Sequence, residues 1–296
     1  MKNKKVLEIK RLKQYFRLNK NKIIKAIDDI SIEIHEGEVL GLVGESGCGK
    51  STLGKSIVGI NKITSGEIIY KGIDISANRK LQKRIVSDNI QFIFQDSTSS
   101  LNSRMTIGEI IAEPLNIKKI YKDKKDRDKR VYEMMKLVGL DKDFINKYPY
   151  DFSGGQRQRV AIARALSINP EFIIADEPIA SLDVSMQAQV INLFKELKNK
   201  GNFTCLFISH DLSMVRYISD RIAVIYNGKI VELAETEELY NNPIHPYTKS
   251  LLDSILIPDI NSSSFEVIGS NVSEYKDYIK SGMKWEEIKK DHFVYM

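Results

Sequence analysis

The chain has 296 residues, of which 42% are hydrophobic and 28% charged, a globular composition long enough for one large domain or two ordinary ones. Its apolar runs fall short of the roughly 18 residues that a membrane-spanning helix needs, and the basic start lacks the apolar stretch of a secretory signal. Two cysteines, Cys48 and Cys205, exclude a disulfide framework and a four-cysteine metal site. We therefore expect a protein of the reducing cytoplasm.

The net charge is +6, with 45 Lys and Arg residues against 39 Asp and Glu. A basic balance suits three classes of partner: nucleic acid, an anionic membrane surface, or a phosphorylated small molecule. Lysine accounts for 33 of the 45 basic residues, whereas arginine supplies the planar fork that recognises bases and phosphates. Two basic blocks, over residues 1–22 and 118–130, lack aromatic residues arranged for base stacking. We expect these blocks to be solvated faces, and we expect no nucleic-acid partner.

The first part of the chain is predicted to consist mostly of strands. Most of these segments alternate apolar and polar residues, which is typical of half-buried strands, whereas the segment 39–43 is apolar throughout. Strands are expected over 6–9, 23–26, 30–34 and 39–43, with a polar connection over 17–22. A strand without alternation indicates burial on both faces, as in a parallel sheet that is flanked by helices.

From residue 50 onward, helical and strand patterns alternate, which favours an α/β domain. Helices are expected over 50–60, within 105–148, and over 157–169 and 186–198. Strands are expected over 67–70, 90–94, 172–175, 204–208 and 223–226. The rhythm is lost after about residue 258, and 261–264 has the composition of a linker.

A glycine-rich loop follows the apolar strand and matches the pattern G-x-x-x-x-G-K-[ST] in full. Its glycines allow backbone N–H groups to turn inward around phosphate oxygens, and the following helix N-terminus adds partial positive charge. Lys50 is expected to reach the β- and γ-phosphates, and the Ser51 hydroxyl to bind Mg²⁺. The predicted nucleotide-binding residues at this end are Gly44, Glu45, Ser46, Gly47, Cys48, Gly49, Lys50, Ser51 and Thr52.

A second apolar strand ends in two carboxylates, Asp176 and Glu177. Asp176 suits a contact with Mg²⁺, and Glu177 could orient and deprotonate an attacking water molecule. Two acids after a strand are common in isolation, but together with the phosphate loop they predict a site for nucleotide hydrolysis.

Four further segments resemble motifs of the ATP-binding cassette (ABC) ATPases, in the order that this family has. Residues 152–159 resemble the signature motif, and Gln95 resembles the Q-loop glutamine. Residues 181–183 resemble the D-loop, and His210 lies in a segment like the switch-histidine motif. The likeness extends from about residue 6 to residue 257.

This resemblance implies an α/β fold: a P-loop NTPase cassette with a RecA-like core, an antiparallel β subdomain and an α-helical subdomain. We expect the ATPase domain over 1–258, with the helical subdomain at about 96–165. Residues 259–296 would be a C-terminal extension whose role the sequence leaves open.

The resemblance also implies roles for individual residues, with ATP and Mg²⁺ as ligands. Glu177, His210 and Gln95 would be catalytic, and Ser51, Gln95 and Asp176 would hold the metal ion. Phe16, or else Tyr15, would stack on adenine. A second subunit would approach the nucleotide with a helix N-terminus in a head-to-tail dimer. The residues at that terminus are Ser153, Gly154, Gly155 and Gln156.

The subfamily is indicated by residues 93–109 and 242–248, which are similar to the ATPase subunits of oligopeptide and dipeptide importers, a group that includes nickel importers. Expected partners are a second ABC ATPase (identical or different), two membrane permease subunits and an external substrate-binding protein, with this chain at the cytoplasmic face of the membrane. His245 is expected to be structural rather than a metal ligand. The tail lacks cysteine, so we expect no iron–sulfur cluster.

Ser97 and Ser103 stand where the family usually has proline, and Phe152 replaces the usual leucine of the signature. Several alternatives stay open at this point. They are a nickel importer, a soluble ABC protein that acts on nucleic acid or ribosomes, a non-catalytic half of a heterodimer, and an exporter, although the cassette of an exporter is commonly fused to membrane helices.

Overall fold

The computed structural model describes residues 4–19, 22–96, 100–180, 182–200, 203–254 and 283–296. Its centre is an eight-stranded sheet in the order β11-β12-β10-β9-β3-β8-β7-β6. The strands are β3 (Val39–Val43), β6 (Ile90–Ile93), β7 (Phe172–Asp176), β8 (Thr204–Ser209), β9 (Arg221–Tyr226), β10 (Lys229–Glu235), β11 (Trp285–Lys289) and β12 (His292–Tyr295). From β6 to β9 the neighbours run parallel, and beyond β9 they run antiparallel.

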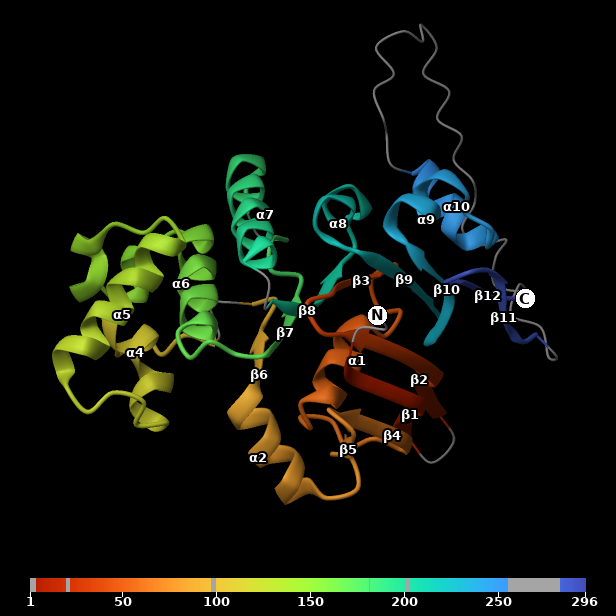
Figure 1. Cartoon of the computed structure of the whole chain (residues 1–296), viewed down its shortest axis with the longest axis horizontal. Coiled ribbons are helices and arrows are strands. Elements are labelled where there is room, and N and C mark those ends of the chain that lie inside the picture. The colour runs from red at the N-terminus through yellow and green to blue at the C-terminus, as the bar shows by residue number, and fades with distance from the viewer. Residues whose placement is uncertain (1–3, 20–21, 97–99, 181, 201–202, 255–282) are drawn as a thin grey trace, which may run out of the picture.

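The parallel strands are covered on both faces, as their uninterrupted apolar sequences predict. In β3, Val39 and Val43 belong to the apolar cluster beneath α7 (Val184–Asn199) and α8 (Leu212–Ile218). Leu40 and Leu42 belong to the opposite cluster, which includes α1. Helix α1 (Lys50–Ile57) therefore lies on the other face of the sheet from α7 and α8 (Figure 1). All residues of β3, β7 and β8 are buried.

A second, antiparallel sheet has the order β2-β1-β4-β5 and packs against the α1 side of the core. Its strands are β1 (Lys5–Asn19), β2 (Lys22–His35), β4 (Ser65–Tyr70) and β5 (Ile73–Asp74). The separate strands expected over 23–26 and 30–34 are parts of one strand, β2. The expected polar connection over 17–22 is wrong for residues 17–19, which belong to β1, and for residue 22, which belongs to β2. Backbone pairing between β1 and β2 continues through several irregularities, because an antiparallel strand tolerates polar residues on its solvated face.

A group of helices lies to one side of the core sheet, beyond β6 and β7 (Figure 1). It contains α4 (Ile107–Ile117), α5 (Lys124–Leu137), η1 (Lys142–Asn146), η2 (Pro149–Asp151) and α6 (Gly154–Leu166). Helix α6 begins before residue 157, the expected start, because Ser153 caps it: the Ser153 Oγ accepts from the Gln156 N–H at 3.3 Å. The helix α2 (Arg79–Asn89) was not expected from its polar sequence.

The C-terminal part adds α9 (Thr236–Asn241), α10 (Pro246–Asp253) and the β11–β12 pair, none of which the sequence patterns predicted. β12 pairs antiparallel with β10 and so extends the core sheet. Its His292 Nε2 donates to the fully buried Glu232 Oε1 at 2.8 Å. The linker-like segment 261–264 lies outside the described residues, as do Ser97 and Ser181.

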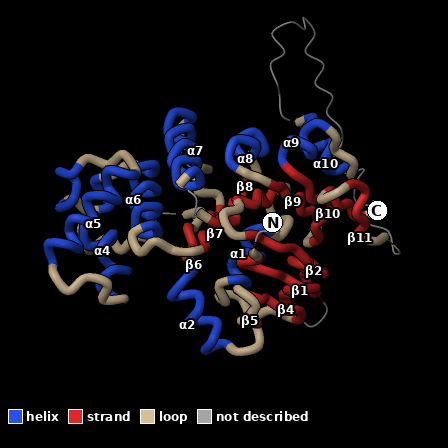
Figure 2. The backbone as a smooth tube through the Cα atoms, viewed as in Figure 1, coloured by secondary structure: helices blue, strands red, loops and turns tan. Residues whose placement is uncertain are grey.

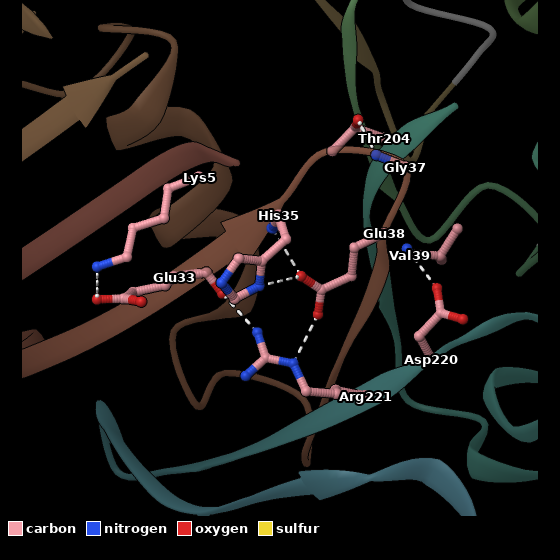
Figure 3. Close-up of polar contacts among 9 residues, drawn as sticks. All are labelled: Lys5, Glu33, His35, Gly37, Glu38, Val39, Thr204, Asp220 and Arg221. Atoms are coloured by element: carbon pink, nitrogen blue, oxygen red, sulfur yellow. Dashed lines mark hydrogen bonds and ion pairs between the residues drawn. The ribbon is translucent and has the colours of Figure 1, made fainter. Parts of the chain in front are cut away.

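The two sheets are joined at the edge where the parallel strands begin (Figure 3). The buried Glu38 accepts from Arg221 Nε at 2.7 Å and from the His35 backbone N–H at 2.6 Å. Asp220 accepts from the Val39 N–H at 2.9 Å. These bonds fix the turn between β2 and β3 against β9. Within the described residues, the helices are too short or too polar to cross a lipid bilayer.

Candidate nucleotide site

The strands of the core sheet run side by side in Figure 2, and the phosphate loop, Gln95, Glu177 and His210 follow the ends of β3, β6, β7 and β8. The strand register places Val43 beside Ser209, Asp176 beside Ile208, and Ile93 beside Ala175. The segments that follow β3, β6, β7 and β8 therefore leave the sheet at one level. Open α/β sheets bind their ligands at this edge.

The phosphate loop needs glycine at positions 44 and 49, because a side chain there would clash with neighbouring backbone and because both residues have a positive φ. Gly44 has φ 155° and Gly49 has φ 114°. A Cβ on Gly44 would lie 2.3 Å from the Ile225 carbonyl oxygen, and one on Gly49 would lie 2.3 Å from that of Ala26. The loop is therefore packed tightly between β2 and β9, and this packing sets its curvature.

Lys50 is buried, and its ammonium group lies inside the curve of the loop. Its Nζ donates to the carbonyl oxygens of Gly44 at 2.7 Å and Glu45 at 2.8 Å. The Cys48 Sγ is 3.9 Å away, and burial raises the pKa of this thiol. The Lys50 ammonium is thus held at the centre of the loop by neutral carbonyl groups. Because these groups do not neutralise its charge, the ammonium can still bind an anion.

Ser51 and Asp176 come together although 125 residues separate them along the chain. The Ser51 Oγ donates to Asp176 Oδ1 at 2.8 Å. Asp176 is 1% exposed, and burial raises its pKa. A hydroxyl and a buried carboxylate form a pair of hard oxygen donors, which suits Mg²⁺.

Glu177 lies between the other two predicted catalytic side chains. Its Oε2 accepts from Gln95 Nε2 at 2.7 Å, and its Oε1 is 3.3 Å from His210 Nδ1. The Glu177 backbone has φ 47°, a left-handed conformation that is costly for this residue type, and its N–H donates to the Ile208 carbonyl at 3.0 Å. Gln95 also lines a cavity of about 380 Å³ together with Asp176 and Lys55.

The signature residues lie apart from this group, at the N-terminus of α6. The Ser153 N–H donates to Gln156 Oε1 at 3.0 Å, so these two side chains satisfy each other's backbone. A Cβ on Gly155 would lie 3.1 Å from Leu182 Cδ2. The signature and the D-loop segment are therefore neighbours. Gly154 and Gly155 leave the helix terminus open to an approaching anion.

Tyr15 and Phe16, the two candidates for adenine stacking, occupy adjacent positions of β1 and so face opposite sides of the sheet. The Tyr15 hydroxyl donates to Asp28, and burial raises the pKa of Tyr15 to about 12. The Asp28 N–H bonds the Gly228 carbonyl at 2.7 Å, and the Gly228 N–H bonds the Cys48 carbonyl at 3.0 Å. Hydrogen bonds thus connect Tyr15, rather than Phe16, to the phosphate loop.

A side-chain contact with the loop was not predicted from the sequence. The Glu45 N–H donates to the hydroxyl of Tyr247 at 2.9 Å. Tyr247 lies in the segment 242–248, which was noted only for its likeness to importer ATPases. His245, expected to be structural, is buried and accepts from the Tyr247 N–H through Nδ1 at 3.2 Å.

Comparison with known proteins shows the family to which the chain belongs. A family model described as "ABC transporter" matches residues 27–180, and one described as "Oligopeptide/dipeptide transporter, C-terminal region" matches residues 231–284. The chain is 54% identical over 295 residues to the oligopeptide transport ATP-binding protein OppF of Bacillus subtilis, with 98% of this chain and 95% of that protein covered. The chain belongs to the ABC transporter family. It is an ATP-binding ATPase of this family.

Two further comparisons agree with this assignment. The dipeptide transport ATP-binding protein DppF of Lactococcus lactis is 53% identical over 86% of this chain and 83% of that protein. The ABC cassette MJ0796, solved as a dimer bound to ADP and phosphate, superimposes with a TM-score of 0.71 at 31% identity, and 78% of this chain and 98% of that chain are covered. The predicted fold, an ABC cassette of the P-loop class, is confirmed.

Proposed function

We propose that the chain is the ATP-hydrolysing subunit of a peptide importer, and that it acts at the cytoplasmic face of the membrane. The observation that carries this proposal is the meeting of Lys50, the Ser51–Asp176 pair and the Gln95–Glu177–His210 group at one sheet edge. Peptide as the cargo is supported by the match over 231–284 and by relatives named for oligopeptide and dipeptide transport.

Binding of ATP would draw the Lys50 ammonium from the two loop carbonyls to the β- and γ-phosphate oxygens, where it meets full negative charge. Ser51 and Asp176 would hold Mg²⁺, with Gln95 close by. The metal ion, when bound, offsets the charge of the phosphates. Either Tyr15 or Phe16 would stack on the adenine.

Glu177 would accept the proton of the attacking water, since its carboxylate is held from both sides. Gln95 donates a hydrogen bond to one carboxylate oxygen and His210 contacts the other, so each oxygen of Glu177 has a neighbour that orients it. His210 would also contact the γ-phosphate and register its loss. Because these groups are oriented before the reaction, catalysis would rest on positioning and electrostatics.

A second ATPase subunit would complete the site. In a head-to-tail dimer, the α6 N-terminus of one subunit, with Ser153 to Gln156, would approach the nucleotide bound to the phosphate loop of the other. The related MJ0796 cassette is a dimer, which supports the presence of a second subunit. Two permease subunits would dock near residues 95–114, and an external substrate-binding protein would deliver the cargo.

Uptake in cells tests the cargo directly. A strain that lacks this chain should lose uptake of labelled di- or oligopeptides, regain it with the wild-type gene, and fail to regain it with Lys50→Ala. Nickel uptake is measured in the same strains. Loss of nickel uptake with unchanged peptide uptake would replace peptide by nickel as the cargo, and unchanged uptake of both would refute the importer proposal.

A further inference from the structure

We propose that Tyr247 is a positioning residue for nucleotide binding: its hydroxyl anchors the phosphate loop through the Glu45 backbone. This inference rests on the proposed function of the loop and adds a residue from outside the recognised motifs. The partners are 202 residues apart along the chain, and the Glu45 N–H lies 2.9 Å from the Tyr247 oxygen.

Glu45 is the residue on which the loop's own contacts converge. Its carbonyl accepts from Lys50 Nζ at 2.8 Å and from the Cys48 N–H at 3.4 Å. The N–H of the same residue is held by Tyr247. Glu45, Ser46 and Gly47 are exposed, and Gly47 has φ 83°, so this part of the loop has little packing of its own to hold it. An anchor at Glu45 therefore restricts the segment next to the phosphate position.

The anchor itself is rigid, because Tyr247 is fixed from several directions. Its side chain is 1% exposed, and its ring centroid lies 4.3 Å from that of Tyr226 at the end of β9. Its N–H donates to His245 Nδ1 in the first turn of α10. The His245 N–H in turn donates to the buried Glu232 at 3.0 Å. Burial raises the pKa of Tyr247, so the phenol stays neutral.

An anchored loop binds nucleotide more tightly because part of its ordering is complete before the ligand arrives. Tyr247→Phe keeps the ring and removes only the acceptor of the Glu45 N–H. The full-length variant should bind ADP, measured by calorimetry in excess EDTA, about three- to tenfold more weakly than wild type, the worth of one hydrogen bond. In ATPase assays KM should rise by a similar factor, while kcat stays within about twofold, since the bound loop is ordered by the phosphates.

Tyr70→Phe is the matched control. Tyr70, on β4, is also buried, and it lies away from the phosphate loop. Its hydroxyl donates to Glu171 at 2.8 Å. Its removal should leave the ADP affinity unchanged, so the two variants separate an effect on the loop from a loss of stability. Equal ADP affinity in Tyr247→Phe and wild type, or equal weakening in both variants, would overturn the inference. Wild-type protein that failed to bind ADP would instead refute the proposed function itself.

Hydrogen exchange on the wild-type chain gives a second test that does not depend on any variant folding. The Glu45 amide should exchange more slowly than those of Ser46 and Gly47, because its hydrogen is held by a buried acceptor. Exchange of the Glu45 amide at the rate of its two neighbours would contradict the anchor.

Discussion

Gln95 Nε2 donates a hydrogen bond to Glu177 Oε2 across 2.7 Å, although the two residues are 82 positions apart. Gln95 follows β6 and Glu177 follows β7, so the parallel pairing of these strands brings them together. The Gln95 amide thereby keeps one carboxylate oxygen oriented while His210 approaches the other.

Glu177→Gln should lower the rate of ATP hydrolysis by about 10²- to 10⁴-fold, the usual contribution of a general base, because an amide cannot accept the proton of water. ATP binding should persist, since Lys50 and the loop are untouched. Steady-state phosphate release and equilibrium binding of labelled ATP measure the two effects separately.

Glu237→Gln serves as the control for that experiment, because Glu237 is exposed and pairs with Arg216 at 2.7 Å. It should hydrolyse ATP at the wild-type rate. Wild-type turnover in Glu177→Gln would show that Glu177 is not the base.

The buried Asp176 carboxylate should lower the free energy of unfolding of the metal-free protein. Burial raises its pKa above the unfolded value, so between these two pKa values the folded state binds more protons than the unfolded state. Stability in EDTA should therefore fall as the pH rises through this window and stay reduced at pH 7. Asp176→Asn removes the buried charge and should raise the free energy of unfolding at pH 7 by about 1 kcal/mol.

Thermal unfolding of wild type and Asp176→Asn, each with ADP in EDTA and with ADP in Mg²⁺, tests the other half of this prediction. Mg²⁺ should add stability to wild type and little to the variant, since the carboxylate that favours a divalent cation is gone. A variant that gained as much stability from Mg²⁺ as wild type would exclude Asp176 as a ligand.

Glu232 should be a stability residue. Its carboxylate is fully buried and accepts from the Ile244 N–H at 2.8 Å, the His245 N–H at 3.0 Å and His292 Nε2 at 2.8 Å. Glu232→Ala leaves these donors without a partner and should lower the free energy of unfolding by about 3 kcal/mol in urea titrations. Glu237→Ala, at an exposed position, should change it little; equal losses in both variants would contradict the role of Glu232.

The parts of the site that the sequence predicted are those in which one short segment carries the chemistry. The loop from Gly44 to Ser51 and the strand that ends at Asp176 are contiguous, and their apolar strands are buried on both faces as expected. Gln95 and His210 were identified by their likeness to family motifs, and they lie together because strand ends in a parallel sheet share one edge. Helix α6 was predicted over 157–169 but spans Gly154–Leu166, so both ends lie three residues earlier than expected; the Ser153 cap explains the start.

The features that the sequence did not predict depend on contacts between residues that are far apart along the chain, and their own sequence patterns are weak. The hydroxyl of Tyr247 meets a backbone N–H, which has no sequence signature. His292 pairs with a glutamate 60 residues earlier, and β12 is only four residues long, which is too short for a sequence pattern to identify it. Helix α2 is largely polar; Asn78 caps its first turn, and Leu81, Ile85 and Val86 pack against the core.

Strands β11 and β12 also determine what the core sheet offers to other molecules. They cover β10, whose Ile230 to Ala234 are buried, and place at the rim a strand whose five residues are exposed and include Glu286, Glu287 and Lys289. Charged residues at a rim oppose joining of sheets from separate molecules. Removal of residues 285–296 would uncover the backbone groups of β10, a mostly apolar strand, and the most direct consequence would be aggregation during purification.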